Sequence, residues 1–423
     1  MCGGSRVVLS SVRTFGRGRP SSSAVSVDSP LRSLGAGFAS WAILLLPILD
    51  GYVSFLPGIS AGLAFFLLGV VVLALTGFKW SGPYLPLMPV ILYLLASPLL
   101  MLAFPIDSVH VYQPLSVALR WGKLLICLVP IFVFGGLGAM QLDSLLRRMR
   151  KIVYVAAVFI VVQRVAYAAG IVVPNPFVAF VSSDSYSLEN YTMGAGALFR
   201  PSAFFLEPSH LTYYVIPFVI CALFGAGKGG FPLCLRDGIV GAAAILCSGS
   251  GMGLLAVFSL FFLYSFMRSR KQVLFLGGVL LVAFALLLIL NTSFFQGVVN
   301  RFLDPNAVGG NAIEARLGDG FLYFENKGFL AQLFGSGYGN VTTDTYYNGL
   351  AFVLCSLGVF GLLALIASVA SSFRASAVMC QRLTAIAFAV FLLGGQVFTA
   401  PYLLLYFCIA GCAIGRREDD PDL

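Results

Sequence analysis

Charged residues are scarce in this sequence: they make up only 10% of its 423 residues, while 59% are hydrophobic. Soluble globular proteins carry roughly 25% charged residues. A soluble fold of this size cannot cover so much apolar surface, so lipid must be the solvent for much of the chain. Alternating polar and apolar segments of about ten residues do not recur, which argues against an outer-membrane barrel. The composition therefore predicts an α-helical membrane protein.

Motifs of several enzyme and pump classes are also missing. The chain has no GxxxxGK[ST] phosphate-binding loop, so it is not an ATP-driven pump by itself. His110 and His210 are the only histidines, and there is no HExxH motif, no paired-cysteine site and no acidic doublet in an outer loop. A metal-dependent mechanism is therefore disfavoured, and we expect neither a metal nor a cofactor. None of the nine cysteines lies in a long loop, so we expect no disulfide framework.

Basic residues exceed acidic ones, 26 against 17, which gives a formal net charge of +9. Most of them lie in short clusters between apolar runs, where they set membrane topology, so the charge does not indicate a nucleic-acid partner. Residues 1–34 are rich in Ser, Gly and Arg and cannot bury a core of their own. We predict a disordered cytoplasmic tail there, and an organelle transit peptide is the alternative.

Ten apolar runs follow this tail, at about 36–56, 58–77, 84–104, 119–140, 152–173, 211–226, 238–267, 273–293, 347–371 and 384–415. A span takes about 20 residues, so the runs 238–267 and 384–415 are long for one span and short for two. Basic residues bracket both runs, and Gly-, Ser- or Pro-containing breaks lie inside them. Each is predicted to be a short hairpin or re-entrant pair.

The predicted fold is therefore an all-α polytopic integral membrane protein with about 12 transmembrane segments. One membrane domain covers 35–415, and both termini, including a short tail at 416–423, are placed in the cytoplasm. Two long loops, 174–210 and 294–346, fall on the outer face. Loops longer than about 12–15 residues are usually functional or disordered. The second loop is rich in Phe, Leu and Tyr, which predicts a small folded cap lying on the membrane.

The first outer loop ends in a segment with candidate chemistry. Pro208 suits the first position of a helix, which makes Glu207 its expected N-cap, and a functional role for this carboxylate is compatible with capping. His210 lies three residues on, so it should share a helical face with Glu207 and Tyr214. The imidazole could shuttle protons, or it could be an interfacial histidine bonded to lipid or backbone.

The second outer loop carries three basic and five acidic residues, so it offers no general attraction for anions. Its glycine-rich run 335–340 could present backbone N–H groups to a phosphate or sugar, or it could be a turn without a ligand. Within the membrane, Arg164 interrupts the fifth run and needs a partner or a wet cavity. Arg120 and Lys123 open the fourth run, where they could simply extend to the surface.

Four segments resemble sequence motifs of bacterial O-antigen and exopolysaccharide polymerases of the Wzy type, and they follow one another in the same order as in that family. These polymerases belong to the O-antigen ligase and polymerase superfamily. Residues 199–209 (FRPSAFFLEPS) resemble the family's R-x-S-x-F-F-x-E-P-S signature. Residues 246–255 (LCSGSGMGLL) resemble its small-residue helix break, although Ser248-Gly249 replaces the usual S-R pair. Residues 314–316 with 333–339 resemble its R…G-x-G loop pattern, and residues 347–361 resemble the start of its next span.

The resemblance implies a glycosyltransferase without a metal that joins oligosaccharide repeat units, each linked to undecaprenyl diphosphate, on the outer face of the bacterial inner membrane. Arginine suits phosphate oxygens, which nominates Arg200 and Arg316, with Arg301 or Arg164 in support. Glu207 is the first candidate for the base that activates the acceptor hydroxyl, and His210 is the second. Further residues expected to bind the substrate are Tyr338, Tyr346, Tyr347 and Asn348. Besides the lipid bilayer, the expected partners are a chain-length regulator and a flippase.

Two alternatives stay open. An O-antigen ligase would transfer the glycan to lipid A core or to a protein, but such ligases usually carry a histidine in the large loop, and this loop has none. A polysaccharide-unit flippase or secondary transporter would place charges at mid-membrane and often shows inverted repeats. No such repeat is visible in the sequence.

Overall fold

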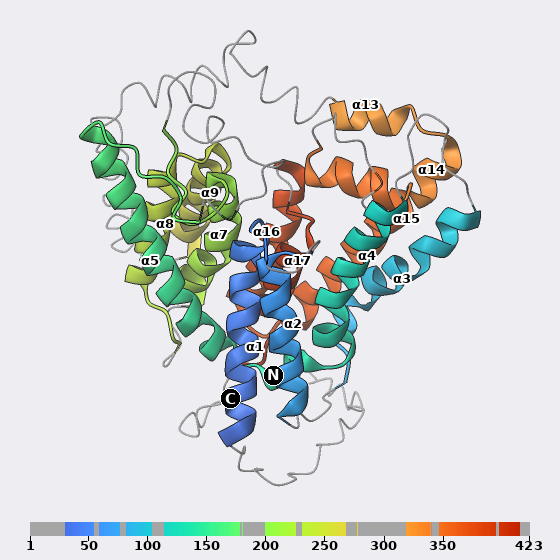
Figure 1. The fold of residues 1–423 in the computed structure, drawn as a ribbon, viewed down its shortest axis with the longest axis horizontal. Coiled ribbons are helices and arrows are strands. Elements are labelled where there is room, and N and C mark those ends of the chain that lie inside the picture. Colours follow the sequence, from blue (N-terminus) through green and yellow to red (C-terminus); the bar gives the residue numbers. More distant parts are fainter. Residues whose placement is uncertain are drawn as a thin grey trace, which may run out of the picture.

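The computed structural model describes residues 30–54, 59–76, 82–103, 114–177, 180, 199–225, 231–267, 277, 319–338, 340, 347–394 and 397–414 (Figure 1). Within these ranges the chain is helical and forms no strand, apart from two isolated β-bridges. The α-helices are α1 (Pro30–Leu49), α2 (Ala61–Leu75), α3 (Met88–Ala103), α4 (Pro114–Leu128), α5 (Leu142–Ala168), α7 (Pro208–Gly225), α8 (Leu235–Ser248), α9 (Gly251–Met267), α13 (Asp319–Glu325), α14 (Phe329–Phe334), α15 (Gly349–Ala375), α16 (Met379–Gly394) and α17 (Ala400–Gly411).

The helices confirm a helical membrane protein. Four of them, α1, α5, α7 and α15, are long and apolar enough to cross a bilayer, and five further apolar helices are shorter. The side of α5 that faces away from the bundle carries a stripe of branched aliphatic side chains at helical spacing. These are Val155, Val158, Val162 and Val165, and each is between 47% and 65% exposed. Such a stripe suits a lipid-facing surface. The count of about 12 segments is not confirmed and stays a prediction, because the run 273–293 lies outside the described ranges except for residue 277.

Both predicted breaks in the long apolar runs are confirmed. Helix α8 ends at Ser248, where Gly249 takes the left-handed conformation (φ 70°) that favours glycine, and α9 begins at Gly251. The second run divides between α16, which ends at Gly394, and α17, which begins at Ala400.

Several predicted boundaries shift. Helix α1 begins at Pro30, so the end of the predicted tail is helical. Helix α5 begins at Leu142, well before the predicted 152, so the basic cluster 147–151 belongs to the helix. In the second outer loop, α13 and α14 pack against α15, as a folded cap would.

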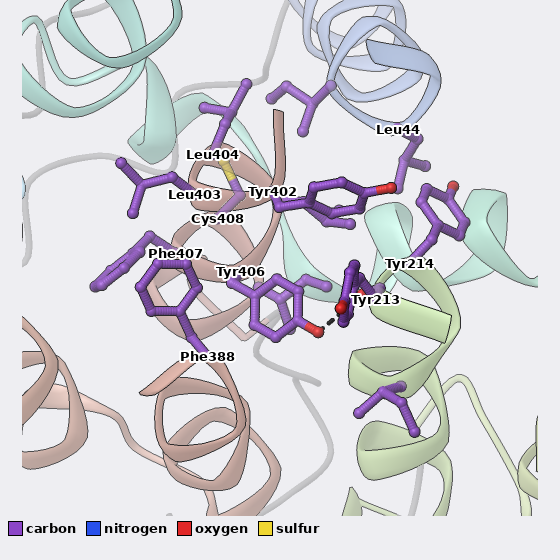
Figure 2. Packing of buried hydrophobic residues seen from close by; sticks show 14 of the residues in the cluster. Leu44, Tyr213, Tyr214, Phe388, Tyr402, Leu403, Leu404, Tyr406, Phe407 and Cys408 are labelled. Carbon is purple, nitrogen blue, oxygen red and sulfur yellow. Dashed lines mark hydrogen bonds between the residues drawn. The ribbon is translucent and has the colours of Figure 1, made fainter. Parts of the chain in front are cut away.

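Helix α17 is the centre of the bundle. All its residues from Ala400 to Ala410 are buried, and it contacts α1, α4, α7, α15 and α16. Figure 2 shows its aromatic side chains packed between Phe388 of α16 and the tyrosines of α7. A helix of this length measures about 18 Å, short of the hydrocarbon thickness of about 30 Å. The segment is thus a half-helix enclosed by protein.

The C-terminal end of α17 illustrates a general requirement, that backbone groups away from water need partners. At its C-terminal end, Gln381 Nε2 donates to the carbonyls of Ile409 (3.2 Å) and Cys412 (2.8 Å). Ser376 Oγ lies 3.1 Å from the Ala410 carbonyl oxygen. The backbone N–H of Leu142 donates to the carbonyl of Ala413, 2.9 Å away. These contacts tie the end of α17 to the starts of α5 and α16.

Prolines inside helices free carbonyls that aromatic side chains then satisfy. Pro217 has no N–H to offer the carbonyl of Tyr213 four residues earlier, and Tyr406 Oη donates to that carbonyl instead at 2.8 Å (Figure 2). In α3, Pro98 likewise frees the carbonyl of Leu94, which accepts from Trp121 Nε1 of α4 at 2.8 Å. Each kink is thereby coupled to a neighbouring helix.

A third kink, in α15, uses glycine. Gly358 has φ 68° and ψ −172° inside the helix, and Gly335 of the preceding loop has φ 81°. A Cβ at Gly358 would lie 2.4 Å from the carbonyl oxygen of Leu333, so only glycine allows the loop to approach this closely. The loop then donates the N–H groups of Ser336 (3.0 Å) and Gly337 (2.9 Å) to carbonyls of Cys355 and Ser356.

Replacing Gly358 by alanine should therefore destabilise the protein by about 1–3 kcal/mol, because the left-handed backbone and the loop contact both exclude a side chain. Reversible unfolding in mixed detergent micelles measures the loss. Gly122→Ala in α4 is the matched control, since a Cβ there meets nothing within 4 Å. It should be neutral or stabilise by up to about 1 kcal/mol. Equal effects of the two substitutions would contradict this account of the kink.

Tyr406→Phe should cost about 1 kcal/mol, because it leaves the Tyr213 carbonyl without its donor. The same substitution in a Pro217→Ala background should cost close to nothing, since the restored backbone N–H can serve that carbonyl. A double-mutant cycle of unfolding free energies tests the pairing. An equal cost in both backgrounds would show that the hydroxyl stabilises the bundle by some other contact.

Candidate functional site

The segment with the strongest sequence signature forms a tight buried turn before α7. Ala203 has φ 55°, a strained value for a residue with a side chain. Its N–H donates to Gln163 Oε1 of α5 at 3.0 Å, and Gln163 Nε2 donates to the carbonyl of Val173 at 3.1 Å. Gln163 is fully buried. This one side chain therefore holds the turn against α5 and against the start of the loop.

A second set of bonds fixes the same turn from the segment that follows α1 and from the start of the loop. Tyr52 Oη donates to the carbonyl of Phe204 at 2.7 Å and accepts from Asn175 Nδ2, also at 2.7 Å. Asn175 Nδ2 lies 3.1 Å from the carbonyl oxygen of Phe205 as well. The turn is thus determined from three sides.

Arg164 links the turn to the break between α8 and α9. Its Nε donates to the carbonyl of Cys247 at 2.8 Å, and its Nη1 donates to the carbonyl of Phe199 at 3.0 Å. A cation at the carbonyl end of α8 also suits the helix dipole. Arg200 lies close enough to interact electrostatically with Arg164. Arg164 of α5 and Arg200 of the turn are therefore within electrostatic range of each other. The intramembrane arginine also has backbone partners, as its position required.

Glu207 is the exposed end of the turn. Its carbonyl accepts from the N–H of Leu211 at 3.2 Å, which is N-cap geometry at the start of α7. Its carboxylate accepts from Ser209 Oγ at 2.8 Å and remains exposed. The predicted N-cap position is thus confirmed, and the exposed carboxylate is accessible for chemistry as well.

His210 lies beside Glu207, at the edge of the buried bundle. Its ring is 6.0 Å from the ring of Tyr402 in α17, and Glu207 and Asp50 both act on it electrostatically. Tyr214, predicted to share this face, packs instead on Phe205, 5.2 Å between ring centroids. The histidine therefore lies within electrostatic range of the exposed carboxylate and of a second acidic residue.

That second acid, Asp50, was missed by the sequence reasoning. It directly follows α1, and its Oδ1 lies 2.5 Å from Lys123 Nζ of α4 and 2.8 Å from Ser60 Oγ. Asp50 also acts electrostatically on Tyr402 and Tyr338. Lys123 is thus in an ion pair rather than simply extended to the surface. A lone carboxylate within the two apolar runs 36–77 was the signal, since an acid there needs a partner.

Three residues that were predicted to bind substrate are buried within the fold, where they pack against other rings or cap a helix. Tyr338 and Tyr347 are 6% and 4% exposed, and their rings contact other aromatic rings, so neither offers a free face to a sugar. Asn348 is buried and caps α15, accepting from the N–H of Ala351 at 2.7 Å. In this conformation the three side chains therefore serve the packing and capping of the fold.

The glycine-rich run also has a structural explanation. The N–H groups of Gly335, Ser336 and Gly337 all donate to backbone carbonyls of the protein, so they are not available to a phosphate in this conformation. Arg301 and Arg316 lie outside the described residues, as does Tyr346. The described part of the chain contains no group of three or more side chains able to hold a metal ion.

Comparisons with protein-family models and with curated proteins find no match to this sequence.

Gln163→Leu should release the turn, because it removes the acceptor of the Ala203 N–H while keeping an apolar side chain of similar size. We expect amide exchange at Ala203 to speed up by roughly tenfold or more, measured by hydrogen–deuterium exchange in detergent. Val162→Leu, on the exposed side of the same helix, should leave this exchange unchanged. Unaltered protection of Ala203 in the Gln163 variant would contradict the proposed anchoring.

Proposed function

We propose that this protein is a metal-independent membrane glycosyltransferase that polymerises oligosaccharide repeat units carried on undecaprenyl diphosphate, in O-antigen or exopolysaccharide biosynthesis. The observation that carries the proposal is the rigid turn 199–207. It holds Arg200 beside Arg164 and leaves the Glu207 carboxylate exposed next to His210. This is the segment whose residues resemble the polymerase signature.

The proposed reaction is a single inverting displacement. A hydroxyl oxygen of the acceptor sugar attacks the anomeric carbon of the growing glycan, and the bond from that carbon to the diphosphate oxygen breaks. The hydroxyl proton passes to Glu207, and undecaprenyl diphosphate leaves with the bonding electron pair. Diphosphate is a good leaving group, so cations that stabilise its developing charge are sufficient.

Residue roles follow from these positions. Glu207 is the preferred base because its carboxylate is exposed at the helix start. His210 is the second candidate, since its imidazole lies within electrostatic range of Glu207 and can carry a proton near neutral pH. Arg200 is the cation proposed for the diphosphate, with Arg164 fixing the turn on which it lies. Arg316 and Arg301 of the second outer loop remain candidates for the same anion.

Location and partners belong to the same proposal. Both outer loops would face the periplasm of a bacterial inner membrane, with both termini in the cytoplasm, because the basic clusters bracket the apolar runs. A flippase would deliver the lipid-linked units, and a chain-length regulator could bind beside the polymerase. An O-antigen ligase acting on lipid A core or a protein remains the closest alternative, since it uses the same chemistry on a different acceptor.

A transporter is the candidate from another class, and one observation favours it. The bundle contains interrupted helices, α8 and α9 as well as the enclosed half-helix α17, together with the Asp50–Lys123 ion pair. Discontinuous helices and charges within the bundle are common around transporter substrate sites. The two functions differ in a measurable product, because a transporter moves the lipid-linked unit without forming a glycosidic bond.

The decisive experiment supplies purified protein in detergent with a synthetic lipid-diphosphate repeat unit. Wild-type protein should produce a ladder of longer glycans whose new linkage has the inverted anomeric configuration. Glu207→Gln should slow the reaction by about 10²- to 10⁴-fold, and Arg200→Ala by about 10²- to 10³-fold. Glu325→Gln is the matched control, because Glu325 is an exposed carboxylate of α13 in the other outer loop. It should keep full activity.

Each other outcome has a defined meaning. A single transfer to lipid A core, without a ladder, would replace the polymerase with a ligase. Movement of the unit across proteoliposome membranes without new linkages would favour the transporter. A ladder that is equally strong in the Glu207 and Arg200 variants would refute the proposed catalytic roles.

A further inference from the structure

A polar cavity lies at the opposite end of α1 from Asp50. Its volume is about 400 Å³, within the range of roughly 300–1,000 Å³ typical of small-ligand sites. The first half of α1, the end of α2, the turn at 138–141 and the start of α5 surround it. In Figure 1 these segments meet at the lower end of the bundle. The residues that matter for its chemistry are Arg32, Gly37, Ser40, Thr76, Ser144 and Arg148.

The cavity is lined by positive charge. Arg32 and Arg148 are its charged residues, and no carboxylate lines it in the part of the chain that the structure describes. Ser40 Oγ donates to the carbonyl of Ala36 (2.7 Å), and Thr76 Oγ1 lies 3.0 Å from the carbonyl oxygen of Val72. These two hydroxyl protons are therefore engaged with the helices, and the two guanidinium groups are the cationic donors that face a ligand.

Arg148 is held in place on the wall of the cavity. Its Nη1 donates to the carbonyl of Ser144 at 3.1 Å and to Ser144 Oγ. Its other terminal nitrogen, Nη2, lies against α1 where Gly37 has no side chain, because a Cβ at Gly37 would be only 2.9 Å away. Glycine at this position thus makes room for the guanidinium, which suits planar recognition of phosphate oxygens.

The surroundings suit a molecule with both a charged and an apolar part. Leu75, at the end of α2, is 81% exposed, and Leu34, in the first turn and a half of α1, is 66% exposed. These side chains flank the lining residues Thr76 and Ser33 in the sequence. Basic pockets between transmembrane helices at the cytoplasmic side are typical sites for anionic lipid headgroups.

We propose that this cavity binds a phosphate-bearing anion between Arg32 and Arg148, at the end of the bundle that the basic clusters assign to the cytoplasm. An anionic phospholipid headgroup and a soluble phosphate compound share this chemistry, and the exposed leucines favour the headgroup. The site is separate from the turn at 199–207 and does not depend on the glycosyltransferase proposal.

Two binding measurements on the full-length protein test the site and separate the sources. The first is native mass spectrometry of protein purified in micelles that contain both phosphatidylglycerol and phosphatidylcholine. It measures how many molecules of each lipid stay bound to the protein. Calorimetry with inorganic pyrophosphate uses protein in phosphatidylcholine-only nanodiscs. We expect selective retention of phosphatidylglycerol, with affinity reduced about tenfold by Arg148→Gln or by Arg32→Gln. Binding of pyrophosphate alone, with the same dependence on both arginines, would identify a soluble ligand at the same site.

Two further variants separate a defined cavity from diffuse surface charge. Arg147→Gln removes the same charge from the neighbouring exposed position of α5, outside the lining, and should reduce binding little. Gly37→Leu keeps both arginines but fills the cavity, and should reduce binding as much as Arg148→Gln does. Equal losses for Arg147→Gln and Arg148→Gln, full binding by Gly37→Leu, or no binding of either probe to the wild type would each overturn the proposal.

Discussion

The structure depends on one requirement: wherever a helix bends or ends within the apolar bundle, the freed backbone carbonyls must find donors. Pro217 and Pro98 each remove a backbone donor inside a helix, and a side chain from another helix supplies the missing hydrogen bond. Gly358 kinks α15, and the loop that precedes this helix donates to its carbonyls. Each interruption therefore becomes a point of attachment between helices. The half-helix α17 depends on this most, because its C-terminal carbonyls are satisfied by side chains and backbone from α5, α15 and α16.

The same requirement fixes the candidate site. The turn at 199–207 enters the bundle as irregular backbone, and it persists there because Gln163, Arg164, Asn175 and Tyr52 pair with its polar groups. These bonds hold Ala203 in a strained conformation and so determine where Arg200 and Glu207 lie. A carboxylate on a loop held this firmly would lose little conformational entropy on binding a ligand.

How far the sequence predicts this site differs from residue to residue. Glu207 and Pro208 were located correctly as the start of a helix, because capping depends only on local sequence. The roles of Tyr338, Tyr347 and Asn348 were not predictable, since an aromatic ring that stacks on sugar and one that packs in a core look alike in a sequence. The ion pair of Lys123 is not predictable from the sequence, because its partner, Asp50, lies far away along the chain.

The sequence alone determined the helical membrane class, the two breaks in the long apolar runs and the need of Arg164 for a partner. Each follows from local composition and from the cost of placing polar groups in hydrocarbon. Only the tertiary structure decided which partner each polar group has: Arg164 with Cys247 and Phe199, and Asp50 with Lys123. Such pairings join segments distant in the chain, and they form only when helix packing brings those segments together.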